Sequence, residues 1–222
     1  MSHAALDPSL AAAFTVADDD RVLANCTLAA HGRASDERLV PWLLDTVSAL
    51  DLELSSIERW TVGTGPGSFS GIRVGISWVL GVCAGTGATV RGVPSSLALA
   101  REATGLGIGD TVAVLHDARR QQVVLSTYQL GENGLAPTGT PAVINPPDLS
   151  VDCYAALVTA QDPVSDLLGD TLVARLLRVS AVDARHLLRA DWPWPADHPA
   201  MIASLEPVYV RPAVFVKPKP VA

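Results

Sequence analysis

Lysine and positive charge are scarce in this sequence. Its two lysines, Lys217 and Lys219, lie close to the end of the chain, and 16 basic residues stand against 23 acidic ones, for a formal net charge of −7. Proteins that bind nucleic acid by themselves draw much of their affinity from basic surfaces. We therefore do not expect autonomous binding of RNA or DNA. The densest basic residues are Arg119-Arg120 and a spaced group that is typical of the solvated face of a helix: Arg175, Arg178, Arg185 and Arg189.

Cysteine and uninterrupted apolar sequence are also rare. Cys26, Cys83 and Cys153 are widely spaced and form no C-x-x-C motif, so we expect buried, reduced thiols in a cytoplasmic protein. Glycine, proline or a charged residue interrupts the apolar runs before the roughly 18–20 residues that a membrane span needs. The first residues lack a basic region followed by a long apolar segment. We therefore expect neither a secretory signal nor a membrane span.

The sequence lacks the usual spacings of metal-binding and catalytic residues. No histidine stands at a motif spacing from Ser68 or Ser70 that would nominate a catalytic base. We predict no catalytic residue, no bound metal and no cofactor. The five histidines form neither H-x-x-x-H nor H-E-x-x-H: they are His3, His31, His116, His186 and His198.

The residues that are present predict a compact α/β protein. Hydrophobic residues make up 49% of the 222 residues and charged residues 18%, a balance that excludes disorder and allows one domain or two small lobes. Apolar patterning predicts a helix that begins at Ser35, with Trp42 at the edge of the core or in a partner contact. Further helices are expected over residues 72–84 and from Ser95 to residue 104, and strands over residues 3–6, 10–16, 22–28, 57–62 and 89–93.

The second half repeats the pattern more weakly, after a glycine-rich break at residues 105–109. We expect Asp117 to cap a turn and to pair with Arg119 or Arg120, while His116 faces the opposite side of its strand. A strand pair with an aspartate-containing turn at the head of each half indicates two related lobes. Strands are expected at 111–115, 122–129 and 155–160, a hairpin turn at 131–134, a loop at 138–147, helices over 167–179 and 181–190, and a packed corner at 192–195.

A glycine-rich stretch, residues 63–75, lies between the strand at 57–62 and the helix at 72–84. A strand, a glycine turn and a helix in this order can hold an anion on backbone N–H groups. They can equally form a tight corner in which Ser70 caps the helix. G-x-G-x-x-G, the P-loop and G-x-S-x-G all fail here, so we favour the structural corner over a phosphate cradle. The stretch includes Gly65, Pro66, Gly67, Ser68, Phe69, Ser70, Gly71 and Arg73.

The same stretch carries a specific resemblance. Residues 65–75 read G-P-G-S-F-S-G-I-R-V-G and closely resemble the signature of the TsaB (YeaZ) family. The turn at residues 117–120 resembles the family's D-A-R-R turn, and residues 207–211 resemble its P-x-Y-x-R close. The resemblance therefore has anchors in the first half, the middle and the end of the chain.

This resemblance implies a two-lobed actin- and sugar-kinase-like fold, with residues 1–105 as the first lobe, residues 106–222 as the second, and the second lobe reduced. In that superfamily each lobe opens with a hairpin whose turn meets nucleotide phosphate. Here the first turn is Asp7-Pro8-Ser9, and proline in place of the family's threonine removes a backbone N–H and a hydroxyl that a phosphate would use. We therefore expect a turn that has lost phosphate binding.

The resemblance also implies a function. TsaB-like chains are non-catalytic partners of a TsaD-type threonylcarbamoyltransferase, which acts on tRNA together with a TsaE-type ATPase, so that tRNA is met only through the complex. The helices matching residues 35–50 and 70–85 form a bundle with the partner, and a homodimer is expected when the partner is absent. The alternative is a small-molecule kinase or other phosphotransferase that uses the glycine loop. The implied interface candidates are Trp42, Asp45, Ala49, Arg73, Ser77, Trp78 and Gly81.

The sequence also departs from the family pattern. The family has H-S-E before the first of these helices, where this chain has Ala34-Ser35-Asp36-Glu37. The histidine is missing unless His31 replaces it from a shifted position. Together with Pro8, this departure marks a diverged member.

Overall fold

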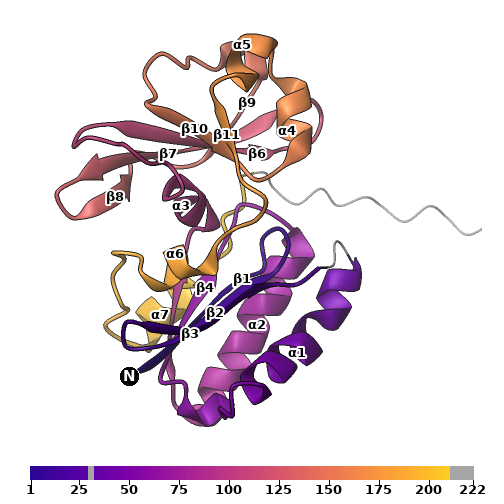
Figure 1. Cartoon of the computed structure of the whole chain (residues 1–222), viewed down its shortest axis with the longest axis vertical. Coiled ribbons are helices and arrows are strands. Elements are labelled where there is room, and N and C mark those ends of the chain that lie inside the picture. Colours follow the sequence, from indigo (N-terminus) through magenta and orange to yellow (C-terminus); the bar gives the residue numbers. More distant parts are fainter. Residues whose placement is uncertain (30–32, 211–222) are drawn as a thin grey trace, which may run out of the picture.

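The computed structural model describes residues 1–29 and 33–210, and it contains two mixed β-sheets with helices around them (Figure 1). The first sheet, sheet A, has the order β3-β2-β1-β4-β5. Strands β1, β2 and β3 are antiparallel to their neighbours, whereas β4 and β5 continue the sheet in parallel with β1. The bounds are β1 Ser2–Asp7, β2 Ala13–Asp18, β3 Arg21–Thr27, β4 Arg59–Gly63 and β5 Thr89–Val93.

The second sheet, sheet B, repeats this plan. Its order is β11-β10-β6-β7-β8, with β6 to β8 antiparallel, β10 and β11 added in parallel, and β9 paired with β7. Strands β6, β7, β8, β10 and β11 thus occupy the places that β1 to β5 hold in sheet A. The bounds are β6 Thr111–Asp117, β7 Val123–Gly131, β8 Gly134–Pro137, β9 Ala142–Ile144, β10 Ala156–Thr159 and β11 Leu176–Arg178.

The helices show why the second lobe is the smaller one. In the first lobe the connections are α1 (Arg33–Ser48) and α2 (Phe69–Thr86), which lie side by side on the outer face of sheet A (Figure 1). In the second lobe a 3₁₀ turn and the short helices α4 (Asp162–Leu167) and α5 (Asp170–Val173) take their places. The predicted fold class, two mixed sheets with flanking helices and a reduced second lobe, is confirmed.

Three short helices tie the two sheets together. α3 (Ser95–Ala100) is fully buried and packs on sheet B, while α6 (Ala184–Leu188) packs on the inner face of sheet A, and α7 (His198–Ser204) lies along β5. The chain therefore returns to sheet A after it has built sheet B. The division of the chain at residue 105 stays a prediction.

Aromatic rings connect sheet A to its outer helices. Phe14 and Trp60 stack inside the sheet's core, with ring centroids 6.1 Å apart. The Trp42 ring of α1 meets Phe14 edge-on at 6.2 Å, and the Trp78 ring of α2 meets Trp60 edge-on at 5.5 Å. Such edge-to-face pairs add to the energy of burial, so both helices are held on the sheet by one aromatic chain.

The tryptophan–proline corner at residues 192–195 packs against sheet A, as predicted. Arg91 of β5 lies under the Trp194 ring at 4.4 Å and donates from Nε to the hydroxyl oxygen of Thr61 at 3.0 Å. It also donates to the backbone oxygens of Trp192 and Ala190. Burial lowers the pKa of Arg91 to about 10.

Several element predictions are wrong in detail. The helix expected over 167–179 gives way to β11, because residues 176–178 pair in parallel with β10. The helix expected over 181–190 shortens to α6, the helix from Ser95 ends at Ala100, and the loop at 138–147 contains β9. Cys153 is exposed, whereas Cys83 is buried; all three cysteines are free. His31, Arg211, Lys217 and Lys219 lie outside the described residues.

Candidate functional site: the glycine corner, the cleft and the helix face

The glycine stretch forms a corner between β4 and α2. Ser68 is extended and its Oγ accepts a hydrogen bond from the backbone N–H of Gly71, which makes Ser68 the N-cap of α2. The prediction of Ser70 as the cap is wrong, because the helix already begins at Phe69. Gly65 has a φ of +98°, which glycine adopts without steric cost.

The glycines of the signature are required by the first hairpin turn. A Cβ at Gly67 would lie 2.2 Å from the backbone oxygen of Ser9, and one at Gly71 would lie 2.6 Å from that of Pro8. A Cβ at Gly75 would lie 2.6 Å from Cγ of Pro8. These short distances leave no room for a side chain at the three positions. The glycines therefore allow the turn at residues 7–9 to pack directly against the start of α2.

The same turn already uses one backbone N–H of the glycine corner. The backbone N–H of Ser68 donates to the backbone oxygen of Ser9 at 2.6 Å. Asp7 is fully buried behind the turn, where its Oδ1 accepts from the backbone N–H and the hydroxyl of Ser9 at 2.9 and 2.5 Å. Burial raises the pKa of Asp7. The geometry favours the structural corner over a phosphate cradle.

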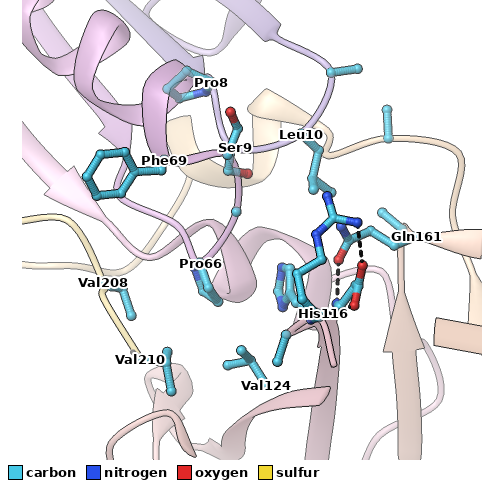
Figure 2. A pocket seen from close by; sticks show the side chains of 18 of the residues that line it. Pro8, Ser9, Leu10, Pro66, Phe69, His116, Val124, Gln161, Val208 and Val210 are labelled. Carbon is cyan, nitrogen blue, oxygen red and sulfur yellow. Dashed lines mark hydrogen bonds and ion pairs between the residues drawn. The ribbon is translucent and has the colours of Figure 1, made fainter. Parts of the chain in front are cut away.

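A cleft of about 690 Å³ opens between the two lobes. Figure 2 shows its lining, with Ser9 and Leu10 on one side, Val124 and Val210 on the other, and His116 between them. The hairpin turn of the first lobe, the glycine corner and the β6–β7 turn therefore meet at one place. In the stretch the structure describes, the remaining lining residues include Ser35, Ala160, Ser180, Ala181 and Tyr209.

His116 and Asp117 differ as the strand alternation predicts. His116 is 2% exposed, and neither ring nitrogen has a hydrogen-bond partner within the described part of the chain. Burial lowers the pKa of His116 to about 4, so the ring is neutral at pH 7. Asp117 accepts from the backbone N–H of Arg119 at 2.7 Å and pairs with its guanidinium at 3.0 Å. The predicted role of Asp117 is confirmed.

The interface candidates divide into two groups. Trp42 and Trp78 are half-buried, since their rings belong to the aromatic chain described above. The remaining candidates have exposed side chains or, for glycine, an exposed backbone: Asp45 on α1, Ala49 directly after the end of α1, and Arg73, Ser77 and Gly81 on α2. The structure thus places the exposed candidates on two helices that lie side by side, or directly after the end of one of them (Figure 1).

Helix α2 is unusually apolar for a helix on the surface. Its 18 residues contain a single charged side chain, Arg73, and their mean hydropathy is 1.3 although only 33% of them are buried. By length and composition alone α2 could cross a membrane; here it covers sheet A through Ile72, Ile76 and Val79. A surface helix normally turns several charged residues to water, and α2 turns only Arg73.

The glycine-rich signature and the P-x-Y-x-R close are far apart in the sequence but meet at the start of α2. Phe69 and Tyr209 are 48% and 45% exposed, and their ring centroids lie 5.3 Å apart. Arg73 donates from Nε to the Tyr209 hydroxyl at 2.7 Å. Sequence reasoning did not nominate Tyr209, although the P-x-Y-x-R close contains it; proximity across 136 residues is invisible in the sequence.

Comparison with known proteins identifies the family. The family model for "TsaD: tRNA N6-adenosine threonylcarbamoyltransferase" matches residues 22–162. The "tRNA threonylcarbamoyladenosine biosynthesis protein TsaB" of Escherichia coli is 31% identical over 46% of this chain and 45% of its own length. YeaZ of Pseudomonas aeruginosa has 26% identity and a TM-score of 0.68, over 84% of this chain and 88% of that one. The chain belongs to the TsaB (YeaZ) family.

Two further similar proteins extend the comparison. An uncharacterized protein of Mycobacterium tuberculosis is 32% identical over 86% of this chain and 82% of its own length. A second solved structure, described as similar to peptidase YeaZ from P. aeruginosa, has a TM-score of 0.69 at 23% identity, over 95% of this chain and 99% of that one, and supports the fold alone. The chain spans about half the length of the E. coli TsaB that it matches.

One group of side chains away from the cleft has donor atoms close enough together to hold a metal ion. Donor atoms of Glu102, Asp183 and His186 all lie within 4.8 Å of one another. His186 Nε2 pairs with Glu102 at 3.2 Å, and Asp183 pairs with Arg185. Because these side chains already contact one another or Arg185, contacts within the chain explain the cluster without a ligand. The sequence search missed it because its members come from two separate segments.

Proposed function

We propose that this chain is the non-catalytic partner subunit of a tRNA threonylcarbamoyl transferase complex. It docks a TsaD-type catalytic subunit through the exposed faces of α1 and α2. By doing so it supports the formation of N6-threonylcarbamoyladenosine in tRNA anticodon loops. Membership of the TsaB family and the name of the E. coli relative support this proposal.

The observation that carries the proposal is the exposed side of α2. A Cβ at Gly81 or Gly85 would meet no atom within 4 Å, unlike one at Gly71 or Gly75. A glycine within a helix costs about 1 kcal/mol relative to alanine. Packing within this chain does not account for Gly81 and Gly85, whereas close approach by a partner helix does, since small residues let two helix backbones come near each other.

The lone chain is proposed to be non-catalytic because its glycine corner is filled from within. The backbone N–H of Ser68 already donates to the backbone oxygen of Ser9, and Pro8 has no backbone N–H. The second candidate is a small-molecule kinase or other phosphotransferase, which the cleft of about 690 Å³ favours. Turnover of ATP by the isolated chain would distinguish this candidate from the docking role.

Further parts of the proposal follow from the family resemblance. A TsaE-type ATPase joins the larger complex, tRNA is contacted only through the complex, and the site of action is the cytoplasm. In the absence of its partner the chain forms a homodimer through the same two helices, because an apolar helix face gains free energy when it is buried.

Size-exclusion chromatography with light scattering tests the docking role. The chain and the TsaD-type protein of the same organism are run alone and mixed at tens of micromolar. We expect a complex with the wild type and its loss with Gly81→Leu, because leucine keeps the two helices apart. Gly139→Leu is the matched control, since a Cβ at Gly139 also meets no atom within 4 Å and Gly139 belongs to the other lobe.

Circular dichroism checks that both leucine variants stay folded. Absence of any complex with the wild type would contradict the proposed function. Equal binding by the wild type and Gly81→Leu would leave docking intact but exclude this face of α2.

A further inference from the structure

Arg73 is an ordered guanidinium on an exposed surface. Its Cζ lies 3.8 Å from the centre of the Phe69 ring and 5.5 Å from that of Tyr209, and its Nε donates to the Tyr209 hydroxyl. Tyr209 is held in turn because the neighbouring Val208 donates its backbone N–H to Thr64 at 2.8 Å. The arginine is thus fixed by two aromatic rings and one hydrogen bond.

The cluster of Phe69, Arg73 and Tyr209, here called the arginine cluster, is not part of the hydrophobic core. Both rings are about half exposed, and Arg73 is exposed. Figure 2 shows the Phe69 ring directed away from His116 and the floor of the cleft. Phe69 and Tyr209 also line the cleft, whereas Arg73 is not among its described lining residues. The cluster therefore does not serve the packing of sheet A.

The terminal nitrogens of Arg73 remain available. No carboxylate in residues 1–29 and 33–210 forms an ion pair with Arg73. The planar fork of an arginine matches a carboxylate with two parallel hydrogen bonds. The start of α2 adds the partial positive charge of a helix N-terminus beside it. Among the exposed positions of α2, Arg73 is the one whose side chain carries a full charge.

Order at an exposed site favours binding. A free surface arginine would lose side-chain entropy when it meets a partner. Arg73 has already lost much of that freedom to Phe69 and Tyr209, so a carboxylate that arrives meets a preorganised receptor. Arginine and aromatic residues are also enriched among the residues that dominate binding energy at protein interfaces.

We propose that the arginine cluster is the receptor for an aspartate or glutamate side chain of the TsaD-type subunit, at one end of the α1–α2 docking face. Arg73 receives the carboxylate, and Phe69 and Tyr209 are positioning residues that orient its fork. This inference rests on the proposed function and names the chemistry that the partner must present.

Binding measured by isothermal titration calorimetry with the TsaD-type protein tests the proposal. Arg73→Gln should weaken the complex by at least about tenfold, as expected when one member of a buried ion pair is removed. Arg73→Lys should lose most of this affinity as well, because lysine offers a point charge and no planar fork. Tyr209→Phe, which removes only the hydroxyl that holds Nε, should show a smaller loss of about threefold.

Arg21→Gln is the matched control. It makes the same change of charge at an exposed position beside the β2–β3 turn, at the far end of sheet A (Figure 1). Its affinity should equal that of the wild type. Affinity of Arg73→Gln within twofold of the wild type, or an equal loss with Arg21→Gln, would overturn the receptor while leaving docking itself intact.

A second measurement uses the lone chain and so does not depend on the docking role. Nuclear magnetic resonance follows the Nε–H signal of Arg73 during titration with acetate and, separately, with inorganic phosphate. We expect a saturable shift of this signal with acetate, and a smaller one in Tyr209→Phe, which keeps the Nε–H but loses the hydroxyl that holds it. No shift of the signal with acetate would overturn the carboxylate assignment. If phosphate nevertheless shifted it, the ligand would be one that bears phosphate.

Discussion

Two glycines on the same helix provide the sharpest test of how α2 is packed. Gly75 and Gly81 lie six residues apart in α2, and both are replaced by alanine. The Cβ of Gly75→Ala would lie 2.6 and 2.9 Å from the ring of Pro8, which is itself buried. The Cβ of Gly81→Ala would meet no atom within 4 Å.

The stability changes of the two variants differ only through packing, because the gain in helix propensity is the same for both. Alanine gains about 1 kcal/mol over glycine in a helix interior, and this gain applies to both positions. Overpacking at a tight site costs about 1–3 kcal/mol, and only Gly75→Ala incurs this cost. We expect Gly81→Ala to raise the free energy of unfolding by about 1 kcal/mol and the two variants to differ by about 1–3 kcal/mol.

Urea unfolding followed by circular dichroism measures this difference, and thermal unfolding should show Gly81→Ala melting about 2–4 °C above the wild type. The slope of free energy against urea should be equal in all three proteins, which shows that the unfolded states are comparable. A destabilised Gly81→Ala, or a Gly75→Ala as stable as Gly81→Ala, would refute the assignment of one glycine to internal packing and the other to an open face.

Three further outcomes are expected. The pKa of His116 is lowered from its ordinary value of 6.5 to about 4 in the folded chain, so the unfolded chain binds a proton first as the pH falls and the free energy of unfolding decreases between these two pKa values. From pH 7 to pH 5, His116→Leu should lose about 2 kcal/mol less of this free energy than the wild type. Equal losses in urea titrations would exclude this effect. Trp194→Ala should cost about 1–3 kcal/mol because it uncovers Arg91; an unchanged melting temperature would show that the corner is not held there. Ser68→Ala should cost about 1 kcal/mol through loss of the α2 cap, whereas Ser70→Ala should stay close to the wild type; the opposite ranking in urea unfolding would return the cap to Ser70.

The sequence predicted most of the first lobe because its elements have strong local signals. The strand before the glycine stretch, the apolar helix after it and the leucine spacing of α1 are patterns within single segments. The signature glycines also predicted a corner correctly, since glycine serves close backbone approach and positive φ. Which atoms make that approach, those of Pro8 and Ser9, depended on a hairpin more than 50 residues earlier.

The second lobe was harder because non-local pairing decides it. Leucines over residues 167–179 fit a helix by spacing, yet Leu176 and Leu177 belong to β11, which exists through its pairing with β10. A short edge strand of three residues carries little pattern of its own.

The interface candidates met the same limit. The family resemblance nominated Trp42 and Trp78 as interface candidates, but their large rings also reach Phe14 and Trp60. The arginine cluster needed the contact between Arg73 and Tyr209, for which no pattern in the sequence exists.

Reconstitution of tRNA modification tests the central claim most directly. The TsaD-type protein and its TsaE-type ATPase are incubated with threonylcarbamoyl-adenylate and unmodified tRNA, with and without this chain, and N6-threonylcarbamoyladenosine is quantified by mass spectrometry. We predict that modification requires this chain and falls with Gly81→Leu, and that the chain alone neither modifies tRNA nor hydrolyses ATP. Full modification without the chain, or modification by the chain alone, would contradict its role as a non-catalytic partner.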